Sequence, residues 1–195
     1  MRAFIGIGLP DSWRHTLNCC AEQVRAVCPE WRDARWVPPE NLHVTLAFLG
    51  EIAPQTVDPI MTALHSTLSS HQPFTLTLKE PVVPVPHGRR VRMLWATLDD
   101  SSGKCEQIAR AVGEAAASYG ALQETRTFKP HITLARARSP LVYAAPGNGG
   151  FDQCITPCLT SDAAMSVALV TLYSSTLTPQ GARYAILGNA PLAGR

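Results

Sequence analysis

The 195-residue sequence has little charge and few histidines, and it lacks any long apolar run. Charged residues make up 16% of the chain and the net charge is +2, which is too mild to indicate a protein that coats nucleic acid but is compatible with a local basic site for one phosphate. No stretch approaches the roughly 18 apolar residues that cross a bilayer, and the opening residues lack the apolar core of a secretory signal. We therefore expect a cytoplasmic protein that makes no contact with a membrane.

The six cysteines follow no recognisable framework. Without an export signal, they are expected to be free thiols in a reducing compartment. Cys154 and Cys158 have a spacing that a metal could use, but no second pair of ligands at a zinc-like distance accompanies them. We expect neither a metal nor another cofactor. The other cysteines are Cys19, Cys20, Cys28 and Cys105.

Length and a hydrophobic fraction of 46% suffice for one sizeable core, so residues 1–195 are predicted to form a single domain, with room for two lobes. Apolar periodicity predicts a helix that begins at Asp11 or Ser12 and two more over about 57–70 and 102–118. Prolines and glycines predict loops at 80–90 and 139–153. Mixed helices and strands without strict alternation favour the α+β class. Strands are predicted at 4–9, 42–49, 74–80, 91–98, 130–136, 166–177 and 183–187.

One phrase occurs twice. "NLHVTLAFLGE" at 41–51 and "KPHITLARARS" at 129–139 each contain histidine, a β-branched residue, threonine and leucine in that order. The composition of the chain makes two such copies improbable by chance. A third His-x-Thr at His65 and Thr67 lacks the β-branched residue.

The local structure separates the two copies from the third match. In a strand, side chains two positions apart point to the same side, so His43 and Thr45 share a face while Val44 points into the core. The same holds for His131 and Thr133. In a helix, residues i and i+2 diverge by roughly 200°. Because 57–70 is predicted to be helical, His65 is interpreted as a coincidence.

Two imidazoles with adjacent hydroxyls suit acid–base chemistry on a phosphodiester. One neutral imidazole can accept a proton from the attacking oxygen, and the other, protonated, can donate to the departing oxygen. An ordinary histidine pKa of about 6.5 makes both forms available near neutrality. Threonine hydroxyls can hold the non-bridging oxygens, and no metal is required. A single histidine on a strand is more often structural, but the doubled motif favours catalysis.

Basic and aromatic residues near the motifs are weaker candidates. Arg136 follows His131 by five positions, so it points away from that histidine unless the strand ends or bulges near Ala135. Lys129 shares the face of His131. Three further arginines could meet an RNA backbone or form a solvated cluster: Arg89, Arg90 and Arg92. Three aromatics could stack on a base or pack in the core: Trp36, Phe48 and Phe128. The remaining histidines are expected at the surface: His15, His71 and His87.

These motifs resemble those of the 2H phosphoesterases, and within that superfamily the chain is similar to the bacterial RNA 2′,3′-cyclic phosphodiesterases, the 2′–5′ RNA ligase group. The similarity extends over nearly the whole chain. It rests on "RAFIGIGLP", "WVPPENLHVTLAFLGE", "RTFKPHITLARAR" and the tail "LYSSTLTPQGARYAIL".

The resemblance implies a bilobal α+β fold in which two pseudo-symmetric antiparallel sheets, flanked by helices, line a central cleft. It implies His43 as the proton donor and His131 as the proton acceptor. Thr45 and Thr133 match the threonines that hold the phosphate, and Arg136 matches an arginine that often follows the second motif. The implied reaction opens an RNA terminal 2′,3′-cyclic phosphate to a 2′-phosphomonoester.

Alternatives remain open at this point. The same site could join RNA ends through 2′–5′ linkages, or the chain could be a nucleotide- or RNA-binding module without catalysis. A metallohydrolase is disfavoured because no acidic ligands lie beside either motif. The expected partners are RNA ends or small cyclic nucleotides, and the chain is expected to be a monomer.

Overall fold

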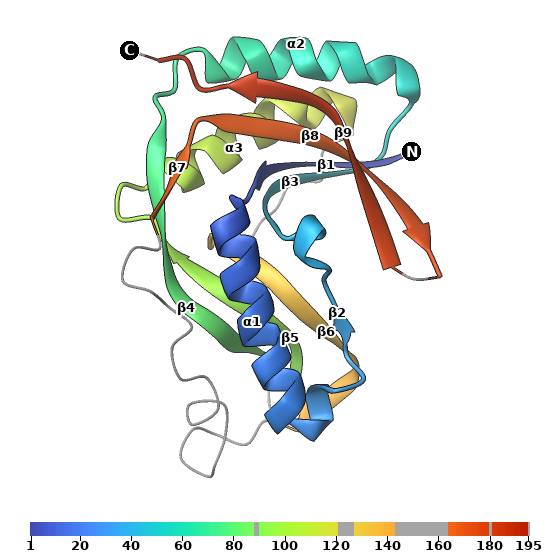
Figure 1. Cartoon of the computed structure of the whole chain (residues 1–195). Helices are drawn as coiled ribbons and strands as arrows, with labels where there is room; N and C mark the ends of the chain where they lie inside the picture. Colours follow the sequence, from blue (N-terminus) through green and yellow to red (C-terminus); the bar gives the residue numbers. More distant parts are fainter. Residues whose placement is uncertain (88–89, 121–126, 143–163, 180, 195) are drawn as a thin grey trace.

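A computed structural model of the chain describes residues 1–87, 90–120, 127–142, 164–179 and 181–194 (Figure 1). Strands and helices are mixed, which confirms the α+β class. The helices are α1 (Asp11–Val27), α2 (Val57–Leu68) and α3 (Lys104–Ala116). The strands are β1 (Arg2–Gly8), β2 (Arg35–Trp36), β3 (His43–Glu51), β4 (Phe74–His87), β5 (Arg90–Asp99), β6 (His131–Val142), β7 (Ala164–Val167), β8 (Leu169–Thr178) and β9 (Gly181–Pro191).

The described strands pair antiparallel in the order β7-β4-β5-β6-β3-β1-β8-β9, with β2 added beside β6. The first four and the last four of these strands form two halves that join where Val44 of β3 pairs with Ile132 of β6. Ile7 of β1 pairs with Val44 and Ala96 of β5 pairs with Ile132, so the four residues form one row across the sheet. All four side chains are buried. The two expected sheets are therefore halves of one continuous sheet that meet between the two motifs.

In each half a helix connects two strands, the second of which is a motif strand: α1, followed by the short β2, connects β1 to β3, and α3 connects β5 to β6. The helices cross over between the halves. α3 contacts β3, while α1 contacts β4 and lies along β5 and β6 in Figure 1. α2 packs against α3 and β9. The buried side chains form one hydrophobic cluster that extends through both halves, which explains why the apolar stripe of α1, with Trp13, Leu17 and Val24, is buried as predicted.

The predicted loop at 80–90 was wrong for most of its length, because β4 continues to His87. Among the described strands, β7 pairs only with Phe74–Thr77, so in this part of the chain β4 has a neighbour beyond Thr77, β5, on one side only. Proline is tolerated on such an edge because a missing N–H on the open side costs no ladder hydrogen bond. Pro84 can therefore pair with Leu94, in a stretch whose register is broken by bulges.

Other boundaries also differ from prediction. β6 runs to Val142, into the predicted loop at 139–153, whose remaining residues lie outside the described part. The short strands β2 and β7 were not predicted separately, because two and four residues carry too little periodicity to detect. No helix in the described ranges is long and apolar enough to cross a membrane.

Candidate active site

Both motifs lie on strands, as predicted, and at the junction of the two halves. Val44 and Ile132 are 1% and 0% exposed, while the histidines and threonines beside them are half-buried on the opposite face. We call the face that carries His43 and His131 the motif face. Because β3 and β6 are antiparallel and pair at Val44 and Ile132, each histidine lies toward the threonine of the other motif.

The two imidazoles are held in the same way. Nδ1 of His43 lies 2.7 Å from the carbonyl oxygen of Asn41, and Nδ1 of His131 lies 2.8 Å from that of Lys129. A carbonyl only accepts hydrogen bonds, so in both rings Nδ1 carries the proton and donates. In the neutral rings Nε2 is consequently the basic nitrogen. Nε2 of His43 lies 3.0 Å from Oγ1 of Thr45.

Arg136 reaches the motif face through a bulge. Leu94 pairs with Ala135 but Trp95 pairs with Thr133, so Leu134 is an extra residue in β6. Leu134 and Ala135 are both buried, and the alternation of side chains shifts by one position after them. Arg136, which strict alternation would direct away from His131, therefore lies on the same face.

Burial and positive charge both act on the titratable groups of the site. Burial lowers the pKa of His43 below its ordinary 6.5, the hydrogen bond to Asn41 opposes this, and the charges of His131 and Arg136 lower it further. The pKa of His131 is lowered by burial and by Arg136, against the hydrogen bond to Lys129. Burial raises the pKa of Tyr184, and Arg136 opposes that rise. The Arg136 guanidinium is thus close enough to act on all three groups.

Both histidines lie beside aromatic rings, and this was not predicted. The ring centroid of His43 lies 4.6 Å from that of Phe4 and 5.3 Å from that of Tyr184, the latter edge-on. Trp95 stacks on His131 with centroids 3.7 Å apart. These rings belong to β1, β9 and β5, so only the pairing of distant strands brings them to the motifs. No signal in the sequence near the motifs could have identified them.

The loop before His43 is tied to the end of the chain. Nδ2 of Asn41 donates to the carbonyl oxygen of Ala182 on β9 at 2.7 Å. The same residue accepts the Nδ1 proton of His43 through its carbonyl oxygen. The β8–β9 hairpin therefore contributes to the position of a histidine 139 residues earlier in the sequence than Ala182.

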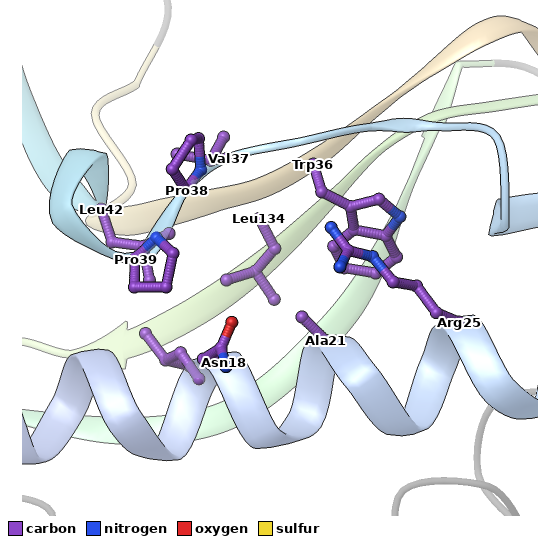
Figure 2. Close-up of a pocket in the computed structure, with 10 residues that line it drawn as sticks. Asn18, Ala21, Arg25, Trp36, Val37, Pro38, Pro39, Leu42 and Leu134 are labelled. Carbon is purple, nitrogen blue, oxygen red and sulfur yellow. The ribbon is translucent and has the colours of Figure 1, made fainter. Parts of the chain in front are cut away.

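The structure places two of the aromatic candidates, Trp36 and Phe48, on different faces of the sheet. Trp36 is not on the motif face. Its side chain lies toward α1, where Arg25 is 4.8 Å above the ring, and both line a cavity of about 230 Å³ with Leu134 (Figure 2). Phe48 is 54% exposed and pairs with Phe4, so it lies on the motif face. Phe128 is half-buried against the core.

The other candidates are dispersed. His65 is exposed on α2, which confirms the predicted helix at this third His-x-Thr match. Lys129 is exposed and contributes its carbonyl oxygen. Arg90 and Arg92 are exposed on β5, His15 is exposed on α1, and His71 is partly buried. Arg89 and the side chain of His87 lie outside the described part.

The cysteines and acidic residues do not assemble into a site within the described ranges. No group of three or more His, Cys, Asp or Glu side chains is placed there to hold a metal ion. Cys19 and Cys105 are free thiols, and burial raises the pKa of Cys105 to about 12. Cys154 and Cys158 lie outside the described part.

Comparison with known proteins agrees with the motifs. The family described as the 2′-5′ RNA ligase superfamily matches residues 9–146. An Escherichia coli protein named RNA 2′,3′-cyclic phosphodiesterase is 30% identical over 192 residues, covering 94% of this chain and 92% of that protein. A protein of the same name from Aquifex aeolicus is 29% identical over 140 residues, 71% of this chain and 72% of that protein.

Solved structures have the same fold. E. coli LigT, crystallised with 3′-AMP, aligns with a TM-score of 0.75 and 28% identity over 98% of this chain and 97% of that one. TT0787 of Thermus thermophilus aligns with a TM-score of 0.75 at 24% identity over 100% and 99% of the two chains, a likeness of fold. The chain therefore belongs to the 2′–5′ RNA ligase superfamily, the 2H phosphoesterases that its doubled motif indicated.

Proposed function

We propose that the chain hydrolyses RNA terminal 2′,3′-cyclic phosphates to 2′-phosphomonoesters, with His43 as the general acid and His131 as the general base. The observation that carries the proposal is the pairing of the two motif strands at Val44 and Ile132, with both imidazoles anchored through Nδ1. Because Nδ1 of each ring is anchored, Nε2 is the atom that takes a proton from the attacking water or gives one to the leaving oxygen; in the free protein Nε2 of His43 lies 3.0 Å from Oγ1 of Thr45. Relatives named RNA 2′,3′-cyclic phosphodiesterase support this substrate.

The proposed reaction is an in-line displacement at phosphorus. Neutral His131 accepts a proton at Nε2 from the attacking water while the new P–O bond forms. The bond between phosphorus and O3′ breaks, and protonated His43 donates its Nε2 proton to O3′. The products are a 2′-phosphomonoester and a free 3′-hydroxyl, and the two histidines have exchanged protonation states. Solvent restores them before the next turnover.

Thr45, Thr133 and Arg136 are proposed to hold the non-bridging oxygens. Hydroxyl groups donate hydrogen bonds to them, and a guanidinium adds charge where negative charge develops in the transition state. The phosphate has a second effect. Burial and Arg136 lower the pKa of His43, which disfavours its protonated form in the free protein. A bound anionic phosphate raises that pKa and favours the acid that the reaction requires.

The mechanism needs no metal ion, because side chains supply the acid, the base and the positive charge. We expect EDTA to leave the hydrolysis of 2′,3′-cyclic AMP unchanged. Loss of activity on chelation, restored by a divalent ion, would reject this part of the proposal. Dialysis against buffer alone is the control.

Product identification tests the function. An RNA with a 2′,3′-cyclic end is incubated with the protein, and the new end is analysed by chromatography against standards. A 2′-phosphate is the expected product. A 3′-phosphate would show that O2′, and not O3′, is the leaving oxygen. A joined RNA would indicate ligation, and unchanged RNA would indicate a binding module.

Variants test the two histidines. His43→Ala and His131→Ala are each expected to lower kcat by about 10²–10⁴-fold, the usual contribution of a positioned general acid or base. His65→Ala is the matched control, since it has the same His-x-Thr context but lies exposed on α2. A wild-type rate in either motif variant would end the paired-histidine proposal.

A further inference from the structure

Positive charge continues along the motif face beyond the phosphate site. Arg35 of β2 pairs directly with Arg136 of β6, so both lie on the same face. The neighbouring Trp36 confirms this orientation, because its ring lies toward α1 and consecutive residues of a strand point to opposite faces (Figure 2). Arg35 is exposed to solvent.

Arg138 extends this charge along the same strand. Its Nε donates to the carbonyl oxygen of Asp33 at 2.7 Å, two residues before Arg35. This bond uses one of the five guanidinium N–H groups and leaves the others available. Residues two apart in a strand are separated by about 6.6 Å, a step of the same order as the distance between successive phosphates of an extended RNA.

Within the described residues, these charges have no carboxylate partners. Arg35, Arg136 and Arg138 form no ion pair there, and the ion pairs present in the same ranges lie elsewhere, at Asp11 and Glu51. Unpaired arginines side by side repel one another, so an anion that bridges them removes an unfavourable interaction. A basic row that starts at the phosphate site and leads away from it fits a polyanion held at one end.

Resting on the proposed function, we propose that Arg35 and Arg138 bind the phosphodiester that precedes the terminal nucleotide. The preferred substrate class is then an oligoribonucleotide with a cyclic end, whose backbone leaves the site over β2 and the far part of β6. Arg136 contacts the cyclic phosphate and the two outer arginines contact the next one. A cyclic mononucleotide occupies only the first of these positions.

The test compares kcat/KM for a short oligoribonucleotide ending in a 2′,3′-cyclic phosphate with kcat/KM for 2′,3′-cyclic AMP. For Arg35→Gln and Arg138→Gln, the ratio of the two values is expected to fall about five- to tenfold. The slope of log kcat/KM against log salt for the oligonucleotide should also decrease by about 0.7 per lost phosphate contact. Arg110→Gln, exposed on α3, is the matched control for loss of one positive charge.

Each outcome supports or overturns the inference. An unchanged ratio in both variants, or an equal loss on both substrates, would overturn it while leaving the proposed function intact. A fall in the ratio for Phe48→Ala but not for Arg35→Gln would indicate that the RNA crosses the other half of the sheet. This result would also overturn the inference. A wild-type protein inactive on both substrates would instead reject the proposed function. Thermal unfolding of each variant, with the mononucleotide rate, reports whether the site remains folded.

Discussion

Gly6 gives a sharp test of how closely β1 and β3 must approach for the site to form. It pairs with Thr45, and a Cβ added to it would lie 2.7 Å from the carbonyl oxygen of Val44 and 3.5 Å from Cδ2 of His43. Its φ is not positive, so alanine is compatible with the backbone conformation itself. Gly6→Ala therefore acts chiefly on the spacing between the strands.

The size of the effect follows from the contact distance. Reaching an ordinary contact of 3.4 Å from 2.7 Å requires a shift of about 0.7 Å between backbone segments, since the clashing atom is a carbonyl oxygen. Overpacking of this kind costs about 1–3 kcal/mol of stability. Val44 also pairs with Ile132, so the shift is passed to the junction between the two motifs. Misplacement approaching 1 Å lowers catalysis by up to about 100-fold.

We expect Gly6→Ala to lower the free energy of unfolding in urea by about 1–3 kcal/mol and kcat/KM for 2′,3′-cyclic AMP by about 10- to 100-fold. Gly113→Ala is the control of opposite sign. Its added Cβ meets nothing within 4 Å on α3, and alanine in a helix gains about 0.5–1 kcal/mol over glycine. A Gly6→Ala protein with wild-type stability and kcat/KM would refute the reasoning, and one with lower stability but full kcat/KM would refute the link to the histidines.

Four further predictions concern the charges and the thiols. Because the pKa values of His43 and His131 are both lowered, kcat/KM for 2′,3′-cyclic AMP should be bell-shaped with a maximum below pH 6.5; a maximum above pH 7 would contradict this. The imidazoles of His43 and His131 bind protons more readily in the unfolded chain than in the folded protein. The unfolding free energy should therefore have its full value above pH 6.5 and decrease as the pH falls through the lowered pKa values, as urea titrations at several pH values can measure. Arg136→Leu should raise the pKa values of both histidines in NMR titrations and lower kcat/KM, and unchanged pKa values would show that its charge does not reach them. Cys105, with a pKa of about 12 and a buried thiol, should resist iodoacetamide at pH 8 in the folded protein while half-exposed Cys19 reacts, as mass spectrometry of the peptides can show; equal labelling of both would contradict the burial.

Local periodicity was sufficient to predict the motif strands. Alternation of apolar and polar residues made 42–49 and 130–136 strands, and the same rule separated His43 from His65. The helix stripes were predicted for the same reason, since each depends on residues within a few turns. The aromatic rings around the histidines were not predictable, because Phe4, Tyr184 and Trp95 reach the site only through long-range strand pairing.

Arg136 shows how far along the strand the alternation of side chains can predict their orientation. In the sequence, the orientation of Arg136 depends on whether the strand ends or bulges near Ala135, and the structure has a bulge at Leu134. The first motif has the same irregularity. Thr45 pairs with Gly6 but Ala47 pairs with Ile5, so Leu46 is the extra residue, and Leu46 and Ala47 are both buried. Leucine followed by alanine occurs in both copies of the phrase, so two consecutive apolar residues after the threonine were a signal for the bulge.

The duplication also explains why the motif alone does not distinguish acid from base. Gly6 and Trp95 are equivalent in the two halves, since each pairs with the threonine of its motif. Where one half has a glycine that allows close backbone approach, the other has an indole that stacks on His131. The indole face favours a cation beside it, which suits the proposed role of His131 as the proton acceptor. His43 instead lies beside Phe4 and nearly perpendicular to the ring of Tyr184, on strands from the two ends of the chain. Two tetrapeptides that differ only in Val44 and Ile132 are therefore given different surroundings by the strands beside them.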